Sequence, residues 1–240
     1  MTRAFMKSAT QPISMLVDTP EIAATGQISP WCISRYKRLF DLVSGCLLLT
    51  LASPAMLVTA LLVRVSSRGP VLFRQLRVGQ AGKCFSLLKF RTMTHGRQEP
   101  GLALTHQGDS RVTSAGRFLR TFKLDELPQL LNVVGGDMSL VGPRPDVPEY
   151  YRLVSRGQQQ VLLLKPGVTG AATLRFRDEE GVLARVPQAQ LLSFYTGTLL
   201  PKKIEMDLAY ARQATFLTDL GLLFRTLIAI FVRHRRGEQQ

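Results

Sequence analysis

A run of apolar residues without a charged side chain covers residues 42–63. As a helix it would rise 1.5 Å per residue and measure about 33 Å, enough to cross the hydrocarbon core of a bilayer. Basic residues flank the run on both sides, so the positive charge assigns it no single orientation. Ser53 and Pro54 lie near its centre, where proline removes a helix hydrogen bond. This pattern predicts a re-entrant hairpin, helix–break–helix, over residues 35–68.

Two other structures are compatible with the same run. A buried core helix of a soluble protein can be equally apolar, and a membrane-spanning helix tolerates a kink at Pro54. The re-entrant form is favoured because it keeps both basic flanks beside anionic lipid headgroups on one face of the membrane.

Short strands are predicted immediately after this segment. Residues 71–78 and 84–93 are rich in apolar residues and are separated by Gly79 and Gly82, which is typical of two strands joined by a tight turn. The polar residues 95–109 are expected to form a loop.

Helical spacing follows in the middle of the chain. Residues 114–122 predict a short helix, and a second helix is expected to open near Asp125. Its apolar side chains recur at i, i+3, i+4 and i+7 from Leu127, and Gly135 and Gly136 end it.

Two more helical regions are predicted toward the C-terminus. One is expected within residues 147–164, and residues 199–232 are expected to form one or two amphipathic helices. Because Asp219 and Arg225 interrupt the apolar face, these last helices are expected to lie in a membrane interface rather than cross it.

The elements together predict a mostly helical α/β protein in three parts. Residues 1–34 contain scattered prolines and no periodicity, so we expect a flexible tail there instead of further spanning helices. Residues 35–68 are the predicted membrane anchor, and residues 69–240 are the predicted domain with the short β unit.

Composition and charge narrow the kinds of protein. The 240 residues include 31 Lys+Arg and 17 Asp+Glu, a formal charge of +14, with 45% hydrophobic residues. The apolar content excludes a disordered chain, and three cysteines form no disulfide framework. The excess of positive charge predicts an anionic partner, which can be nucleic acid, a phosphorylated substrate or lipid headgroups.

The adjacent acids Asp125 and Glu126 are the strongest candidates for chemistry, because no histidine or cysteine cluster has metal-ligand spacing. Helix capping is the simpler explanation of such a pair. Arg120 and Arg144 flank the acids, however, and Mg²⁺ prefers oxygen ligands together with phosphates. The segment therefore also fits a site for Mg²⁺ and a phosphate.

Two basic segments are candidates for binding that phosphate. Lys89 and Arg91 alternate along the second predicted strand and would share one face of it, although a solvated strand face explains them as well. Arg144 lies between Pro143 and Pro145, whose restricted backbone reduces the entropy lost when the guanidinium binds a phosphate.

Five segments in order resemble the bacterial sugar transferases, which are small monotopic polyprenyl-phosphate phosphoglycosyl transferases. They are LFDLVSGCLLLTLASPAMLVTALLVR, GPVLFRQLRVG, FSLLKFRTM, LDELPQLLNVVGGDMSLVGPRP and KPGVTG. The resemblance extends from about Tyr36 to Val232 and is most specific between Leu124 and Pro145.

The resemblance implies a reaction in which a UDP-sugar gives its sugar-1-phosphate to undecaprenyl phosphate and UMP is released. Asp125 would be the nucleophile and would form a covalent aspartyl-phosphosugar, while Glu126 would join it in binding Mg²⁺. The predicted substrate-binding residues are Lys89, Arg91, Arg120 and Arg144. Ser53 and Pro54 match the break in the family's re-entrant membrane helix.

The resemblance also implies a location and partners. The chain would lie in the bacterial inner membrane with residues 69–240 as its cytoplasmic catalytic domain. It would initiate an exopolysaccharide, capsule, lipopolysaccharide O-antigen or glycoprotein glycan. The expected partners are a UDP-sugar, undecaprenyl phosphate and anionic membrane lipids, but not nucleic acid, and a homodimer is a possible assembly.

Two alternatives remain open at the level of sequence. The first is a non-enzymatic basic protein that binds a membrane or nucleic acid through its charge. The second is another phosphotransfer enzyme acting on a polyprenyl lipid, such as a phosphatase. Residues 171–180 also depart from the commoner family pattern, in the region expected to contact the nucleotide or sugar.

Overall fold

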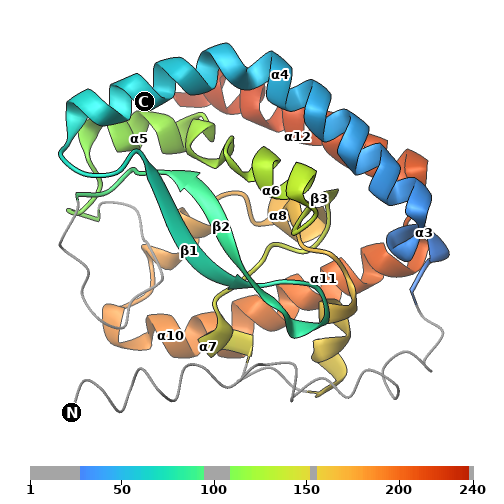
Figure 1. Cartoon of the computed structure of the whole chain (residues 1–240). Helices are drawn as coiled ribbons and strands as arrows, with labels where there is room; N and C mark the ends of the chain where they lie inside the picture. The colour runs from blue at the N-terminus through green and yellow to red at the C-terminus, as the bar shows by residue number, and fades with distance from the viewer. Residues whose placement is uncertain (1–27, 95–108, 152–155, 238–240) are drawn as a thin grey trace.

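The computed structural model describes residues 28–94, 109–151 and 156–237, and within them the chain is mostly helical with two small sheets (Figure 1). The helices are α3 (Pro30–Ile33), α4 (Arg35–Ser66), α5 (Ser114–Thr121), α6 (Gln129–Gly135), α7 (Pro148–Tyr151), α8 (Ala171–Arg175), α9 (Glu179–Leu183), α10 (Leu191–Phe194), α11 (Leu200–Gln213) and α12 (Phe216–Gly237). The strands are β1 (Leu72–Val78), β2 (Cys84–Phe90), β3 (Ser139–Val141) and β4 (Gly167–Thr169). Shorter 3₁₀ or π segments are η2 (Gln80–Gly82), η3 (Leu124–Glu126), η4 (Arg156–Leu163), η5 (Gln188–Gln190) and η6 (Tyr195–Leu199).

The predicted two-stranded unit is confirmed. Strands β1 and β2 pair in antiparallel register from Leu72 opposite Phe90 to Val78 opposite Cys84. Gly82 in the connecting turn has φ 71°, a left-handed conformation that glycine adopts without steric cost.

A second, parallel sheet escapes prediction because its strands have only three residues each and therefore no detectable period. Ser139 pairs with Gly167 and Val141 with Thr169. A Cβ atom on Gly167 would lie 2.1 Å from the backbone nitrogen of Gly142, so only glycine allows this approach. The pairing brings the segments VGPRP and KPGVTG together.

Helix α4 runs without interruption through Pro54, so the predicted break in the helix is wrong. The proline cannot donate a hydrogen bond to the carbonyl of Thr50, and the hydroxyl of Ser53 donates to that oxygen instead at 2.8 Å. This substitute bond keeps the helix together, while Figure 1 shows α4 curving along one side of the molecule.

Among the described residues, α4 is the one helix long and apolar enough to cross a membrane. Only 11% of its most apolar window is buried, so the alternative of a core helix is wrong. Near its beginning, Asp41 accepts hydrogen bonds at 3.0 Å from the hydroxyl of Ser139 and the backbone N–H of Leu140. Just beyond its end, Arg91 donates to the carbonyl of Ser67 at 2.6 Å. Both ends of α4 are thus attached to the same domain.

The first described residues belong to the folded domain. The backbone N–H of Ser29 donates to the carbonyl of Ala211 at 2.9 Å, and the Trp31 indole donates to Asp219 at 2.9 Å. Cys32 in α3 is buried in the core. The expected tail is therefore wrong for residues 28–34, while its remainder, residues 1–27, lies outside the described residues.

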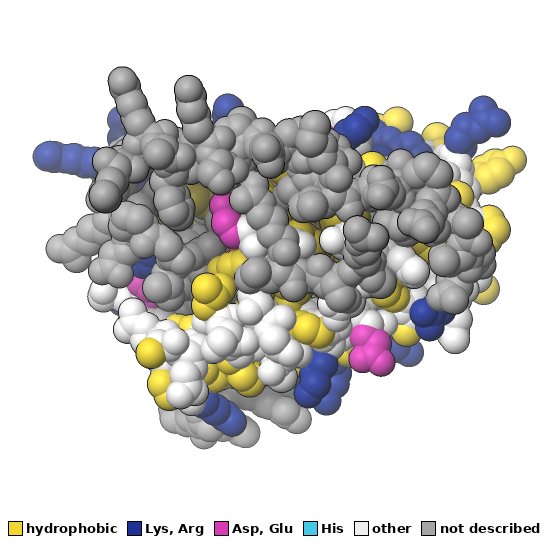
Figure 2. Space-filling model, turned by 90° about the horizontal axis from the view of Figure 1, so that it is seen from below, with side chains coloured by type: hydrophobic (Ala, Val, Ile, Leu, Met, Phe, Trp, Pro, Cys, Tyr) yellow, Lys and Arg dark blue, Asp and Glu magenta, His cyan; other side chains and the backbone are white. Residues whose placement is uncertain are grey.

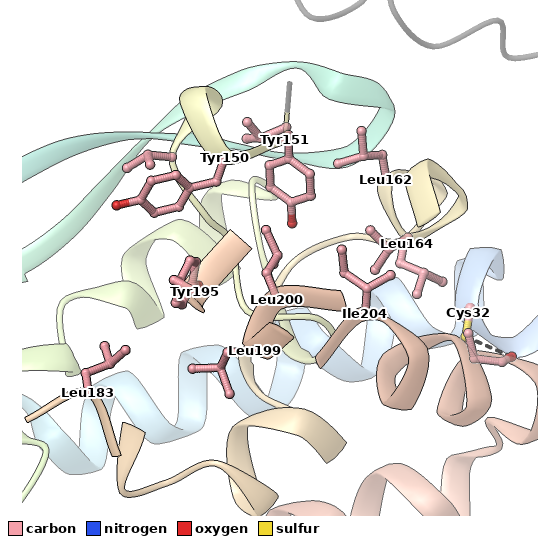
Figure 3. Packing of buried hydrophobic residues seen from close by; sticks show 14 of the residues in the cluster. Cys32, Tyr150, Tyr151, Leu162, Leu164, Leu183, Tyr195, Leu199, Leu200 and Ile204 are labelled. Atoms are coloured by element: carbon pink, nitrogen blue, oxygen red, sulfur yellow. Dashed lines mark hydrogen bonds between the residues drawn. The ribbon is translucent and has the colours of Figure 1, made fainter. Parts of the chain in front are cut away.

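The larger hydrophobic core lies between α11, α7 and η4, where Tyr150, Tyr195, Leu200 and Ile204 pack together (Figure 3). Helices α11 and α12 confirm the helical prediction for residues 199–232. Within residues 147–164, where a helix is expected, the structure has helix α7 and the 3₁₀ segment η4. The expected loop at 95–109 falls almost entirely outside the described residues.

Candidate active site

Asp125 and Glu126 lie in the 3₁₀ turn η3 and not in the first turn of an α-helix. Helix α6 begins later, at Gln129, so the expected helix opening near Asp125 is wrong and neither acid caps α6. The turn is closed by the backbone N–H of Glu126, which donates to the carbonyl of Lys123 at 3.2 Å. Lys123 has φ 58°, an uncommon left-handed conformation for a residue with a Cβ atom.

The side chain of Asn132 links helix α6 to β2 by hydrogen bonds. The amide oxygen of Asn132 accepts from the N–H of Leu88 at 3.1 Å, and its amide nitrogen donates to the carbonyl of Ser86 at 2.9 Å. Because β2 also contains Lys89, this contact brings the Lys89 ammonium to the turn with the two acids.

The carboxylate of Glu126 is held by two cations. Arg144 donates to both of its oxygens, at 2.5 and 3.3 Å, and the Lys89 ammonium lies 3.4 Å from one of them. Burial alone would raise the pKa of Glu126, but the charges of Arg144 and Lys89 hold it well below its usual range. Glu126 is therefore an ionised anchor for the basic side chains.

The carboxyl group of Asp125 has different surroundings. Its Oδ1 atom is buried and has no hydrogen-bond partner, and the residue is only 6% exposed. Burial and the neighbouring charge of Glu126 raise the pKa of Asp125, against the opposing charges of Lys89, Lys123 and Arg120. Asp125 is thus the acid of the pair with a carboxylate oxygen whose hydrogen-bonding capacity is unused.

Arg120 reaches the same region from the last turn of α5. Its Nε donates to the hydroxyl of Thr92 at 3.0 Å, and one terminal nitrogen lies 3.3 Å from a carboxylate oxygen of Glu180. The start of α5 also lies against Thr92, since a Cβ atom on Gly116 would be 2.1 Å from the Thr92 carbonyl. This close packing places the guanidinium near Asp125.

Arg91 does not join the other predicted site residues. It lies just beyond the end of β2, is 6% exposed, and donates to carbonyl oxygens of Val63, Ser67 and Pro70 at the end of α4. The shared face expected for Lys89 and Arg91 is therefore wrong: Lys89 points to Glu126, and Arg91 holds the end of α4.

An apolar hollow of about 320 Å³ adjoins the turn with the acids. It lies between the second half of α4 and the end of α5, and the residues that line it are Pro54, Ala55, Val58, Thr59, Leu62, Phe118, Leu119 and Leu124. Leu124 immediately precedes Asp125, and Pro54 is one of the two residues of the predicted helix break. The hollow thus lies between the predicted membrane anchor and the residue that precedes Asp125.

Residues far along the chain complete the site, and sequence reasoning missed them. Glu180 contacts Arg120, while Glu179 receives a hydrogen bond from Lys203 at 2.9 Å. Their one signal in the sequence is the departure from the family pattern at residues 171–180, which gives no indication of which cations they would contact.

A divalent cation fits this site in part. Among the described residues, no three His, Cys, Asp or Glu side chains gather as they would in an all-protein metal site. Mg²⁺ commonly uses one or two carboxylates and completes its shell with water and substrate phosphates. The unpartnered oxygen of Asp125 fits that role, whereas Glu126 would have to share its oxygens with Arg144 and Lys89.

Comparison with known proteins gives one family. The model of the family described as "Bacterial sugar transferase" matches residues 33–233. The chain is 32% identical over 240 residues to the exopolysaccharide production protein ExoY of Rhizobium meliloti, with 94% of this chain and 97% of that protein covered.

Two longer relatives carry a more specific name. The UDP-glucose:undecaprenyl-phosphate glucose-1-phosphate transferase of Klebsiella pneumoniae is 39% identical over 201 residues, covering 82% of this chain and 40% of that protein. The protein of the same name from Escherichia coli K12 is 36% identical over 225 residues, covering 92% of this chain and 44% of that protein. The chain therefore spans less than half the length of these two relatives.

Proposed function

The chain belongs to the bacterial sugar transferase family, and from this premise we propose that it transfers a sugar-1-phosphate from a UDP-sugar to undecaprenyl phosphate. The product would be a lipid-linked sugar diphosphate that initiates a surface glycan. UMP would be the second product. The observation that carries this proposal is the contrast between Asp125, which has an unpartnered oxygen, and Glu126, whose oxygens are bound by cations.

The first chemical step would use Asp125 as the nucleophile. A carboxylate oxygen attacks the β-phosphorus of the donor, a new P–O bond forms, and the bond to the bridging oxygen breaks so that UMP leaves with its electron pair. The lipid phosphate then attacks the aspartyl-phosphosugar, and the Asp125 carboxylate leaves unchanged. No general base would be required if both attacking oxygens are ionised, and the charges of Lys89, Lys123 and Arg120 favour the ionised form of Asp125.

The basic residues around the acids would stabilise the phosphates in this reaction. The charges of Lys89 and Arg120 both lower the pKa of Asp125, and the same charges would favour a phosphate bound there. Arg144 is oriented by Glu126, and its guanidinium has five N–H donors, more than its two bonds to Glu126 use. Burial lowers the pKa of Lys89 to about 8, although the charge of Glu126 opposes this.

Mg²⁺ would be held by Asp125 together with the donor's phosphates, and by Glu126 to the extent that its two cations allow. When bound, it would neutralise part of the negative charge on the transferring phosphoryl group. We therefore expect EDTA to stop UMP release and added Mg²⁺ to restore it. Turnover that persists in EDTA would contradict a metal requirement.

The acceptor lipid would reach Asp125 from the membrane through the apolar hollow between α4 and α5. Three features support this: the exposed apolar surface of α4, the hollow beside Leu124, and the attachment of both ends of α4 to one domain. We propose that α4 enters and leaves the membrane on the cytoplasmic side as one curved helix. A second hollow of about 160 Å³, whose lining includes Arg35, Arg38 and Lys165, would lie near anionic headgroups.

The decisive test is Asp125→Asn in the purified full chain. The variant should lose UMP release from every UDP-sugar by at least about 10³-fold, because an amide cannot serve as the nucleophile. Glu205→Gln, an exposed change of equal charge on α11, is the matched control and should keep wild-type turnover. Appreciable turnover by Asp125→Asn would contradict the assignment.

A further inference from the structure

Two adjacent glutamates near the start of α9 contact different parts of the protein. Glu179 accepts a hydrogen bond at 2.9 Å from Lys203 of α11, whose side chain is 5% exposed. Glu180 reaches in another direction, to Arg120 of α5, at 3.3 Å. The first pair anchors α9 to the body of the domain, and the second connects α9 with the candidate active site.

The contact between Glu180 and Arg120 is easily broken. The Glu180 side chain is 50% exposed and that of Arg120 is 22% exposed, so water competes with the ion pair. Exposed pairs of this kind contribute little to stability. By comparison, a nucleoside diphosphate brings several negative charges and can bind a guanidinium with paired N–H···O hydrogen bonds.

Arg120 is kept in place whether or not Glu180 is bound to it. Its Nε donates to the hydroxyl of Thr92, and Thr92 packs against the start of α5 at Gly116. Glu180 can therefore leave the guanidinium without loss of the position of Arg120. The terminal nitrogens would then be available to an anion beside Asp125.

We propose that Glu180 occupies Arg120 in the free enzyme as a stand-in for a substrate phosphate and is displaced by the diphosphate of the donor. Glu180 thereby lowers the affinity for the donor, because the donor's diphosphate must compete with the Glu180 carboxylate for Arg120. This inference rests on the proposed function, because it concerns how the donor enters that same site.

The kinetic test is Glu180→Gln, measured with the UDP-sugar that the enzyme uses. Removal of the competing charge should lower KM for the donor by about two- to five-fold, which corresponds to the strength of an exposed ion pair. The value of kcat is expected to change less than KM. Glu205→Gln removes an exposed charge of the same sign elsewhere and should leave KM unchanged. An unchanged or higher KM in Glu180→Gln would overturn the proposal.

A binding test separates this inference from the proposed reaction. Calorimetry with inorganic pyrophosphate should show about two- to five-fold tighter binding to Glu180→Gln than to the wild type. In an Arg120→Gln background, the Glu180→Gln change should have no effect on pyrophosphate binding. If the enzyme uses no UDP-sugar but these differences are found, the proposed function fails and the competition stands. If turnover is found but the pyrophosphate affinities are equal, the competition is wrong.

Discussion

Asp125 and Glu126 are neighbours in the chain, yet the two carboxyl groups differ in almost every property that matters for catalysis. Both lie beside basic residues, but only Glu126 is bound by Arg144 and Lys89. Its pKa is accordingly held low, whereas burial and the charge of Glu126 raise that of Asp125. Residue type and spacing place both acids in the site, and the contacts divide their roles.

The pKa of Asp207, which lies on α11 away from the candidate active site, also depends on its surroundings. Its Oδ1 accepts a hydrogen bond from the N–H of Ala172 at 3.2 Å, and burial raises its pKa to about 7. The folded state therefore binds a proton more tightly than the unfolded chain, where an aspartate has a pKa of about 3.9. As the pH rises from about 4 to 7, ionisation of Asp207 lowers the free energy of unfolding. Above pH 7 this loss of stability is complete.

We predict that Asp207→Asn stabilises the protein more at pH 8 than at pH 5. The amide oxygen of the variant can still accept from Ala172, but the amide does not titrate. The free energy of unfolding of the variant relative to the wild type should therefore rise by on the order of 2 kcal/mol from pH 5 to pH 8. Denaturant unfolding at the two pH values measures it. Glu205→Gln on the same helix is the control for loss of one negative charge, and an advantage independent of pH would contradict the prediction.

At the scale of elements, the position of the turn η3 depends on the contacts that hold α6. The turn η3 leads into α6, and the guanidinium of Arg38 from α4 donates to the carbonyls of Val133 and Val134 at 2.6 and 2.8 Å. These carbonyls lie at the C-terminal end of α6, where a cation is favoured by the helix dipole. Helix α4, the proposed membrane anchor, therefore also supports the candidate active site.

Arg38→Gln should lower the thermal stability and the turnover together. The loss of two charge-assisted hydrogen bonds costs about 1.5–3 kcal/mol, which lowers Tm by about 3–10 °C. Arg35→Gln removes the same charge from an exposed position on the same helix and is the matched control. If both changes lower Tm equally, the loss of charge, and not the loss of the contact with α6, causes the destabilisation.

At the scale of the whole molecule, α4 and α12 form one apolar side. The rings of Phe40 of α4 and Phe216 of α12 are in edge-to-face contact, with their centroids 5.2 Å apart. Figure 1 shows both helices along the same side of the molecule. The large side chains exposed on them include Leu47, Leu51, Leu57, Val58, Leu61, Val65, Leu217, Leu220, Phe224, Leu227 and Ile228. On another face, the described side chains that are visible are a mixture of basic, acidic and hydrophobic types (Figure 2). Exposed apolar side chains gathered on neighbouring helices mark a surface that binds a membrane or another protein.

The orientation of α4 can be tested by labelling in cells. Single cysteines at the exposed positions Arg35→Cys and Arg68→Cys, in a background with Cys46→Ser and Cys84→Ser, should both react only from the cytoplasmic side. The reason is that both ends of α4 are bound to one domain. Labelling of one position from the opposite side would favour a spanning helix.

Much of the architecture is determined by local patterns in the sequence. The β1–β2 unit, α5, the end of α6 at Gly135 and the two C-terminal helices follow from residue spacing and from glycines, because these signals act over a few residues. The same applies to the apolar character of α4 and to the presence of carboxylates among basic residues. The family motifs likewise depend on order along the chain and need no structure.

Only the tertiary structure decides which of these residues meet. It places Lys89 beside Glu126 and Arg91 at the end of α4, although Lys89 and Arg91 are only two positions apart in the sequence. It pairs Arg120 with Glu180 from 60 residues away and leaves one oxygen of Asp125 unpartnered. Such contacts depend on the packing of distant elements and on local burial, and burial sets the electrostatic free energy of each charge. The sequence therefore determined the set of charged groups, and the fold determined what each of them does.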